Sequence, residues 1–285
     1  MEQDTKYWVE MKITELNLTD SKDVGEILMM IREVIEEFSE FPERYEEIVI
    51  LLASAKQAED GTLDKTLESI FGRRILTTNK SLPGHGLGVG TKGCLQAILE
   101  PFENMSERMQ RFMIRHECGH LLFPHKTSIS LSILQAKYSG NLAVLESFQN
   151  DYPVHLCIIE RYTEGWLEKP LGISKNMVSP RIAFRQETRK GGVKQAIFYA
   201  IINSVNVLRI IYIYDFLLSK HPELKEKFTS DIQRYHRYLN SWWYCLAKGT
   251  NCKLPEPTKI LKPHHFESKE SFFSQILWLL TKTKV

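Results

Sequence analysis

Residues 104–120 read NMSERMQRFMIRHECGH and end in the pattern His-Glu-x-x-His. On an α-helix, His116 and His120 lie about one turn apart, so both imidazoles project from the same face and can bind one zinc ion. Glu117 then lies beside the water molecule that such a metal polarises. We therefore expect a helix here that carries two metal ligands and a general base.

The residues before the motif favour a helix with defined ends. Asn104 is placed as an N-cap and Glu107 as its capping-box partner, and Pro101 and Pro124 bracket the segment. The pattern predicts an amphipathic helix with a buried stripe, and it predicts Cys118 as a small buried side chain pointing away from that stripe. The stripe contains the two histidines and Met109, Phe112 and Met113.

The chain before the motif is predicted to be helical and then to form two short strands. From about residue 22 to residue 71 the apolar residues repeat at helical spacing, including those between 45 and 53. Residues 74–78 and 94–99 are typical of strands, and the glycine-rich stretch 81–90 between them predicts a turn or hairpin. Its glycines do not open a helix after a strand, which argues against a phosphate-binding loop.

From about residue 142 onward the sequence again predicts helices. Breaks are expected at Gly191-Gly192 and Pro222, with a long apolar helix over 194–219, an aromatic-rich helix over 228–247 and a last helix over 271–280. The predicted fold class is α+β and predominantly helical, with a small sheet packed against the motif helix and further helices on both sides. The predicted regions are a helical support region, a catalytic core and a C-terminal helical region, or one compact domain overall: 1–71, 72–165 and 166–285.

Charge and composition argue against several classes of partner. The chain has 37 basic and 35 acidic residues, so no strong field favours nucleic acid or a membrane surface. Polar residues such as Arg209 and Asp215 interrupt the most apolar stretch, 196–218, which suits a buried helix better than a bilayer span. The aromatic cluster over 235–244 is more typical of a core than of a base-stacking surface. The acidic start and the absence of a Cys-x-x-Cys pair predict a reduced, cytoplasmic protein.

A catalytic zinc site needs a third protein ligand beyond the two histidines. The segment 145–155 offers two acids, and we favour Asp151, with Glu146 as the alternative. Pro153 predicts that a helix starts or bends near Asp151. His155 is expected either to orient a ligand or to act as a fourth donor that closes a structural site.

Two resemblances bear on this choice. Glu146 with Asn150 resembles the third-ligand helix of gluzincins, in which a Glu binds zinc and a later Asp or Asn steadies a ligand histidine. The segment 151–155 resembles the Asp-x-x-Val/Ile-Asn element of a metallopeptidase family with the pattern HExxHxxxxH, which His125 completes here, although His155 stands in the place of the Asn. This resemblance implies a zincin-type fold with Asp151 as ligand, and we expect His125 in a loop near the mouth of the site. Lys126 occupies the position of the third histidine of metzincins and excludes that subclass.

The expected function is zinc-dependent hydrolysis, with Zn²⁺ as cofactor, Glu117 as general base and a peptide or protein as substrate. In zincins the strand before the motif helix usually forms the edge along which an extended peptide lies, and 94–99 resembles that element. The expected substrate-edge residues are Leu95, Ala97 and Ile98. Two alternatives stay open: a zincin-fold regulator or binding protein without turnover, and a structural zinc site.

Overall fold

The computed structural model describes residues 12–18, 24–38, 40–73, 84–122, 141–162 and 178–284, and these residues fall into two compact units. The first unit comprises the described residues up to Leu122, together with Tyr162. The second comprises the described residues from Asn141 to Arg161 and from Val178 onward. The helix over 141–161 therefore belongs to the second unit, whereas our predicted regions placed it with the motif helix in 72–165.

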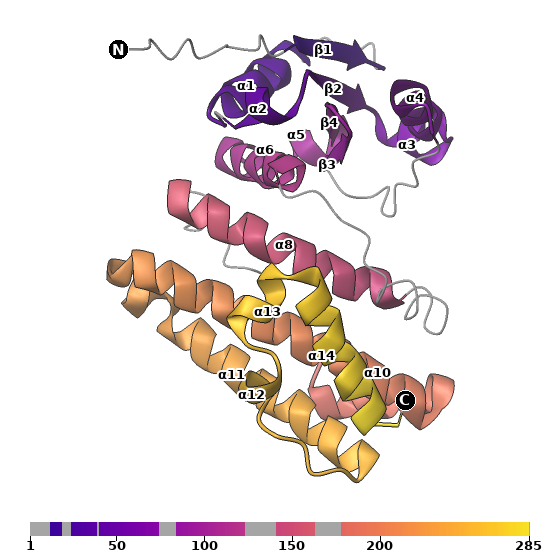
Figure 1. Cartoon of the computed structure of the whole chain (residues 1–285), viewed down its shortest axis with the longest axis vertical. Coiled ribbons are helices and arrows are strands. Elements are labelled where there is room, and N and C mark those ends of the chain that lie inside the picture. Colours follow the sequence, from indigo (N-terminus) through magenta and orange to yellow (C-terminus); the bar gives the residue numbers. More distant parts are fainter. Residues whose placement is uncertain are drawn as a thin grey trace, which may run out of the picture. The chain divides into compact units, whose positions relative to one another are not determined.

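The first unit contains a sheet with helices on both faces (Figure 1). The strand order is β1-β2-β4-β3; β1, β2 and β4 are parallel, and β3 is antiparallel to β4 at one edge. The elements of this unit are β1 (Lys12–Asn17), α1 (Val24–Glu36), α2 (Phe41–Arg44), β2 (Glu47–Ala53), α3 (Ala55–Glu59), α4 (Thr62–Phe71), β3 (Gly84–Val89), β4 (Lys92–Ile98), α5 (Leu99–Glu103) and α6 (Glu107–Leu122).

Strand β2 forms the centre of this unit because both of its faces are apolar. Its side chains alternate between the two faces of the sheet, as they do on any strand. Ile48 and Ile50 pack in the cluster formed with α1 and α6, whereas Val49 and Leu51 pack in the cluster formed with α3 and α4. Our prediction of helix throughout 22–71 was therefore wrong over 47–53, since a continuous apolar run suits a parallel strand buried on both sides.

Every regular element that the structure describes in the second unit is a helix or a 3-10 turn (Figure 1). The predicted break at Gly192 is confirmed, because its φ of 83° and ψ of 177° interrupt the helical backbone inside α10. The helices of this unit are α8 (Asn141–Arg161), α10 (Pro180–Lys220), the 3-10 turn η1 (Pro222–Leu224), α11 (Lys225–Thr250), α12 (Pro257–Ile260), α13 (Pro263–Glu267) and α14 (Lys269–Lys282). The predominantly helical α+β class is thus confirmed.

Of the two outcomes predicted from Pro153, a start or a bend of the helix near Asp151, the start is wrong. The helix continues through this proline from Asn141 to Arg161. A proline inside a helix removes one backbone hydrogen bond, but buried side chains on either side, Tyr152 and Val154, provide packing that offsets the loss.

Helix α10 is long and apolar enough to cross a membrane, and among the described residues no other helix passes that test. However, 78% of its most apolar window is buried.

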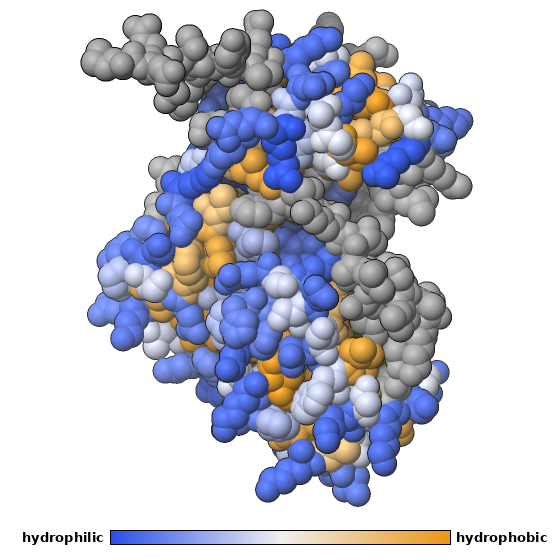
Figure 2. Space-filling view, viewed as in Figure 1, coloured by the Kyte–Doolittle hydropathy of each residue, from blue (hydrophilic) through white to orange (hydrophobic). Residues whose placement is uncertain are grey.

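In the space-filling view, small hydrophobic patches are scattered over a mostly hydrophilic face (Figure 2).

Candidate metal and catalytic site

Helix α6 carries the His-Glu-x-x-His motif in the first unit. The helix begins at Glu107, one residue after Ser106, whose hydroxyl accepts a hydrogen bond from the Met109 amide at 3.4 Å. The predicted N-cap, Asn104, instead ends α5, and its side-chain amide donates to the carbonyl of Glu100. Ser106 can cap α6 because it directly precedes the first helical turn.

The buried stripe of α6 agrees with the prediction at Met113 and differs from it at the two histidines. Ile114, Cys118 and Leu121 are fully buried against the sheet and α1, whereas His116 and His120 are half-buried beside that stripe. The predicted burial of Cys118 is confirmed. Burial raises the pKa of its thiol well above the usual value, so Cys118 remains protonated and is a poor metal ligand.

The Nε2 atoms of the two histidine rings on α6 lie close to one another. Nε2 of His116 lies 3.1 Å from Nε2 of His120, and the ring planes are perpendicular. Two nitrogens bound to one tetrahedral zinc at about 2.0–2.1 Å would lie about 3.3 Å apart. The spacing of the two imidazoles therefore fits a shared zinc ion with very little adjustment.

Glu117 is buried and points its carboxylate toward the edge strand β3. The backbone N–H of Gly86 donates to its Oε2 at 2.8 Å. A hydrogen bond to a charged acceptor is stronger than one between neutral groups, and this one restricts the orientation of the carboxylate. Glu117 is thus held in place by a backbone group from another element.

Alternating glycines allow β3 to approach α6 this closely. A Cβ on Gly86 would lie 2.0 Å from the carbonyl oxygen of Glu117, and one on Gly84 would lie 3.0 Å from the methyl group of Met113. At Gly88 the Cβ would lie 2.2 Å from the hydroxyl of Tyr45. Residues two apart share one face of a strand, so the three glycines together form a face without side chains. We predicted a turn or hairpin over 81–90, and β3 is one arm of a hairpin with β4. The bounds of this strand were not predicted, although the alternation Gly-x-Gly-x-Gly was its signal.

The ends of α6 are anchored to the rest of the first unit. The Tyr45 hydroxyl donates to the carbonyl of Leu121, and the Arg44 guanidinium donates to that of Leu122, so two terminal carbonyls of the helix are satisfied. Arg115, which directly precedes the motif, makes two hydrogen bonds of 2.9 and 3.0 Å to the carboxylate of Glu37. These contacts fix both the position and the rotation of the motif helix.

The predicted substrate edge is wrong. Strand β4 lies between β2 and β3, so hydrogen bonds occupy both of its sides, and its residues Leu95, Ala97 and Ile98 are at most 1% exposed. The edge on this side of the sheet is β3. The predicted strand over 74–78 and the residues His125 and Lys126 lie outside the described part of the chain.

The candidate third ligands lie on α8, in the second unit. Asp151 accepts a hydrogen bond at 2.6 Å on Oδ2 from Arg209, whose side chain is only 9% exposed. Arg209 also donates to the Asn206 side chain and lies over the ring of Phe148. The sequence marks Arg209 only as a polar interruption of an apolar stretch, and no local pattern predicts its pairing with Asp151.

The other candidates on α8 have different surroundings. Glu146 forms an ion pair with Lys269, and the two acids, Glu146 and Asp151, lie about 140° apart around the helix axis. His155 lies one turn beyond Asp151 and is buried, with Nδ1 at 2.6 Å from the carbonyl oxygen of Asp151. Because a carbonyl only accepts, Nδ1 must be the donor, and in the neutral ring Nε2 then carries the lone pair. Asn150 is half-buried next to Asp151.

Comparison with known proteins adds no family to this description: no family model, curated protein or solved structure matches the chain.

Proposed function

We propose that this chain is a zinc-dependent hydrolase that cleaves peptides. The observation that carries the proposal is the arrangement on α6, where the two histidine Nε2 atoms lie 3.1 Å apart and Glu117 is oriented by the amide of Gly86. A separation of 3.1 Å also fits a hydrogen bond between two imidazoles, so the buried and oriented carboxylate of Glu117 beside them is what favours a reactive site over an inert pair. We also propose that the first unit, with its small sheet packed against this helix, is a zincin-like core.

We propose His116, His120 and Asp151 as the three protein ligands. Each offers one nitrogen or oxygen atom of the kind that zinc binds. Asp151 is favoured over Glu146 because the buried Arg209 side chain donates to Oδ2 and holds the carboxylate in one orientation. Zinc ligands are commonly fixed in this way by a neighbouring group.

Bound zinc would acidify a water molecule and polarise a substrate carbonyl. Glu117 would accept the proton of the attacking water and then transfer it to the leaving amine. The Gly86 amide keeps the carboxylate from rotating away during these two transfers. The general base is thereby positioned before the substrate arrives, which lowers the entropic cost of the reaction.

A peptide is the substrate that the sheet edge favours. In an antiparallel pair, residues that exchange backbone hydrogen bonds alternate with residues that do not. The Gly86 amide bonds to Glu117, so Gly84, Gly86 and Gly88 are the residues of β3 whose backbone groups point away from β4. Extended peptides bind sheet edges through such backbone groups.

The test is the variant Glu117→Gln, with zinc content and hydrolysis of a peptide library measured together. Its amide oxygen can still accept the Gly86 hydrogen bond, so we expect a folded protein with about one zinc per chain and no measurable turnover. Glu68→Gln, an exposed change on α4, is the matched control and should behave as wild type. Wild-type turnover in Glu117→Gln would exclude the general-base role, and a zinc-free wild-type protein would exclude the metal site.

One observation favours a second candidate, a structural zinc site closed by four protein ligands. His155 lies one turn beyond Asp151 on the same face of α8 and is buried, and imidazole is a common metal ligand. Cobalt substitution would separate the two candidates. If adding a small thiol or hydroxamate changes the cobalt spectrum of the wild-type protein, the site is open and catalytic. If the addition changes the spectrum of His155→Ala but not that of the wild type, the site is closed by His155.

A further inference from the structure

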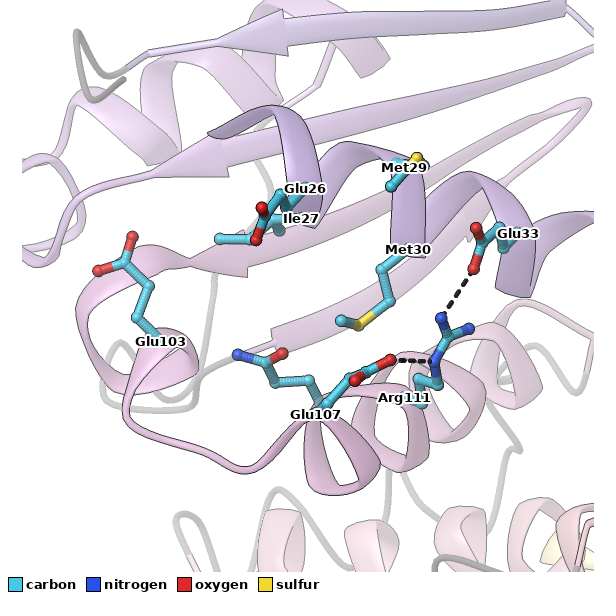
Figure 3. Close-up of a pocket in the computed structure, with 9 residues that line it drawn as sticks. Glu26, Ile27, Met29, Met30, Glu33, Glu103, Glu107 and Arg111 are labelled. Carbon is cyan, nitrogen blue, oxygen red and sulfur yellow. Dashed lines mark hydrogen bonds and ion pairs between the residues drawn. The ribbon is translucent and has the colours of Figure 1, made fainter. Parts of the chain in front are cut away.

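A pocket of about 620 Å³ opens between α1 and α6 in the first unit, with α5 at one end (Figure 3). None of the motif residues lines it. Glu107 lies nine residues before His116, and nine residues turn a helix by about 900°, which places the two on opposite sides of α6. The pocket is therefore separate from the candidate metal site and reaches α6 from the opposite face.

The lining of this pocket is acidic. It contains four glutamates and a single cation, Arg111, which is occupied by Glu33 at 2.8 Å and Glu107 at 3.2 Å. Glu26 and Glu103 form no hydrogen bond or ion pair with any described residue. Figure 3 shows these two carboxylates at the end of the pocket away from Arg111. At one end of the pocket Arg111 offsets one of two negative charges, and at the other end Glu26 and Glu103 carry two negative charges with no cation of the pocket lining beside them.

The remaining lining is apolar and adaptable. Ile27 and Met30 pack on the core cluster, and Met30 points into the space between α1 and α6 (Figure 3). Met29 is 58% exposed, which is high for a residue of this type. Methionine side chains adjust their shape to aliphatic groups and are frequent on surfaces that bind peptides.

We propose that this pocket binds a lysine or arginine side chain of a partner polypeptide, with an apolar neighbour of that residue covering Met29. The aliphatic stem of the basic side chain lies along Met30, and its cationic end pairs with Glu26 and Glu103. A metal ion is a poorer fit, because these carboxylates are not among the described groups whose ligand atoms lie close enough to share one. A small free amine would leave Met29 exposed to water, whereas a peptide covers it.

The test uses the full chain labelled with ¹³C in its methionine methyl groups, of which there are eight. The probes are the capped tripeptides acetyl-Leu-Lys-Leu-amide and acetyl-Leu-Glu-Leu-amide, titrated separately. The signals of Met29 and Met30 are assigned with the variants Met29→Leu and Met30→Leu. Met113 packs under Gly84 beside Glu117, so its signal reports peptide binding at the candidate metal site instead.

We expect the lysine peptide, and not the glutamate peptide, to shift the Met29 and Met30 signals. Glu26→Gln combined with Glu103→Gln should weaken this binding about fivefold or more, and so should raising the salt from about 50 mM to about 500 mM. Glu36→Gln, an exposed glutamate on α1 that does not line the pocket, is the matched control and should bind as wild type.

Three results would overturn the proposal: equal shifts with both peptides, shifts confined to Met113, or unchanged affinity in the double glutamine variant. The readout does not depend on zinc or on turnover. A failure of the hydrolase proposal therefore leaves this test unaffected, and the reverse also holds.

Discussion

Gly86→Ala should disrupt the first unit at the contact that orients Glu117. The new Cβ would lie 2.0 Å from the carbonyl oxygen of Glu117 and 2.8 Å from its carbonyl carbon, both backbone atoms that no side-chain rotation can move. Strand β3 and α6 must therefore separate by about 1.4 Å to reach ordinary contact. This movement would break the 2.8 Å hydrogen bond between the Gly86 amide and the carboxylate.

The expected cost has two parts. Overpacking costs about 1–3 kcal/mol, and losing a hydrogen bond to a buried carboxylate costs about 1.5–3 kcal/mol. Their sum, about 4 kcal/mol, corresponds to a roughly thousandfold rise in the population of the opened state. Gly25→Ala on α1 is the control, because a Cβ there meets nothing within 4 Å, and it should change stability by about 1 kcal/mol or less.

Hydrogen–deuterium exchange of the full chain measures this effect locally. We expect faster exchange in peptides that cover β3 and α6, with exchange in α10 and α11 unchanged as an internal reference. Wild-type protection of β3 and α6 in Gly86→Ala would refute the argument, and so would equal losses in Gly86→Ala and Gly25→Ala.

Two further predictions concern the second unit. Arg209→Met should lower the free energy of unfolding by about 3–5 kcal/mol, because it leaves the Asp151 carboxylate without its buried cation. Adding Asp151→Asn should restore most of the loss in urea titrations, and strictly additive costs would contradict the pairing. Burial raises the pKa of Tyr152 to about 12, so the folded state favours the neutral phenol, and stability should fall by about 2 kcal/mol between pH 10 and 12. Tyr152→Phe should remove part of this fall in alkaline unfolding curves; an unchanged curve would argue against it.

The sequence predicted the elements whose side chains repeat with a clear helical period. The apolar stripe that begins at Val24 lies on α1, and the aromatic-rich segment 228–247 lies on α11. The motif helix was predicted to within a few residues of its ends. Periodicity sufficed in these helices because each has one apolar face and one polar face. The pairing of His116 with His120 on one face of α6 followed from the same geometry.

Periodicity failed where a strand has no polar face or has no side chains on one face. Strand β2 is apolar on both sides, so its residues fit a helical stripe as well as a buried strand. The residues of β3 that face α6 are glycines, so this strand lacks the alternation of apolar and polar side chains by which a strand is predicted. The wrong choice of edge strand came from the resemblance to zincins, in which the strand before the motif helix usually forms the edge, whereas here β3 lies at that edge. The Arg209–Asp151 pair joins residues 58 positions apart, and no local pattern encodes it.

The contacts of the Tyr45 hydroxyl limit where the chain can be truncated. This hydroxyl lies against Gly88 and bonds to the end of α6, while β2, immediately after Tyr45, separates β1 from β4. A fragment starting at residue 72 would retain the motif but would leave the edge of β4 that pairs with β2 open and two carbonyls of α6 without their donors. Open strand edges of this kind recruit other chains. The shortest soluble piece that holds the histidines should therefore begin before residue 12, well upstream of the region that the motif marks.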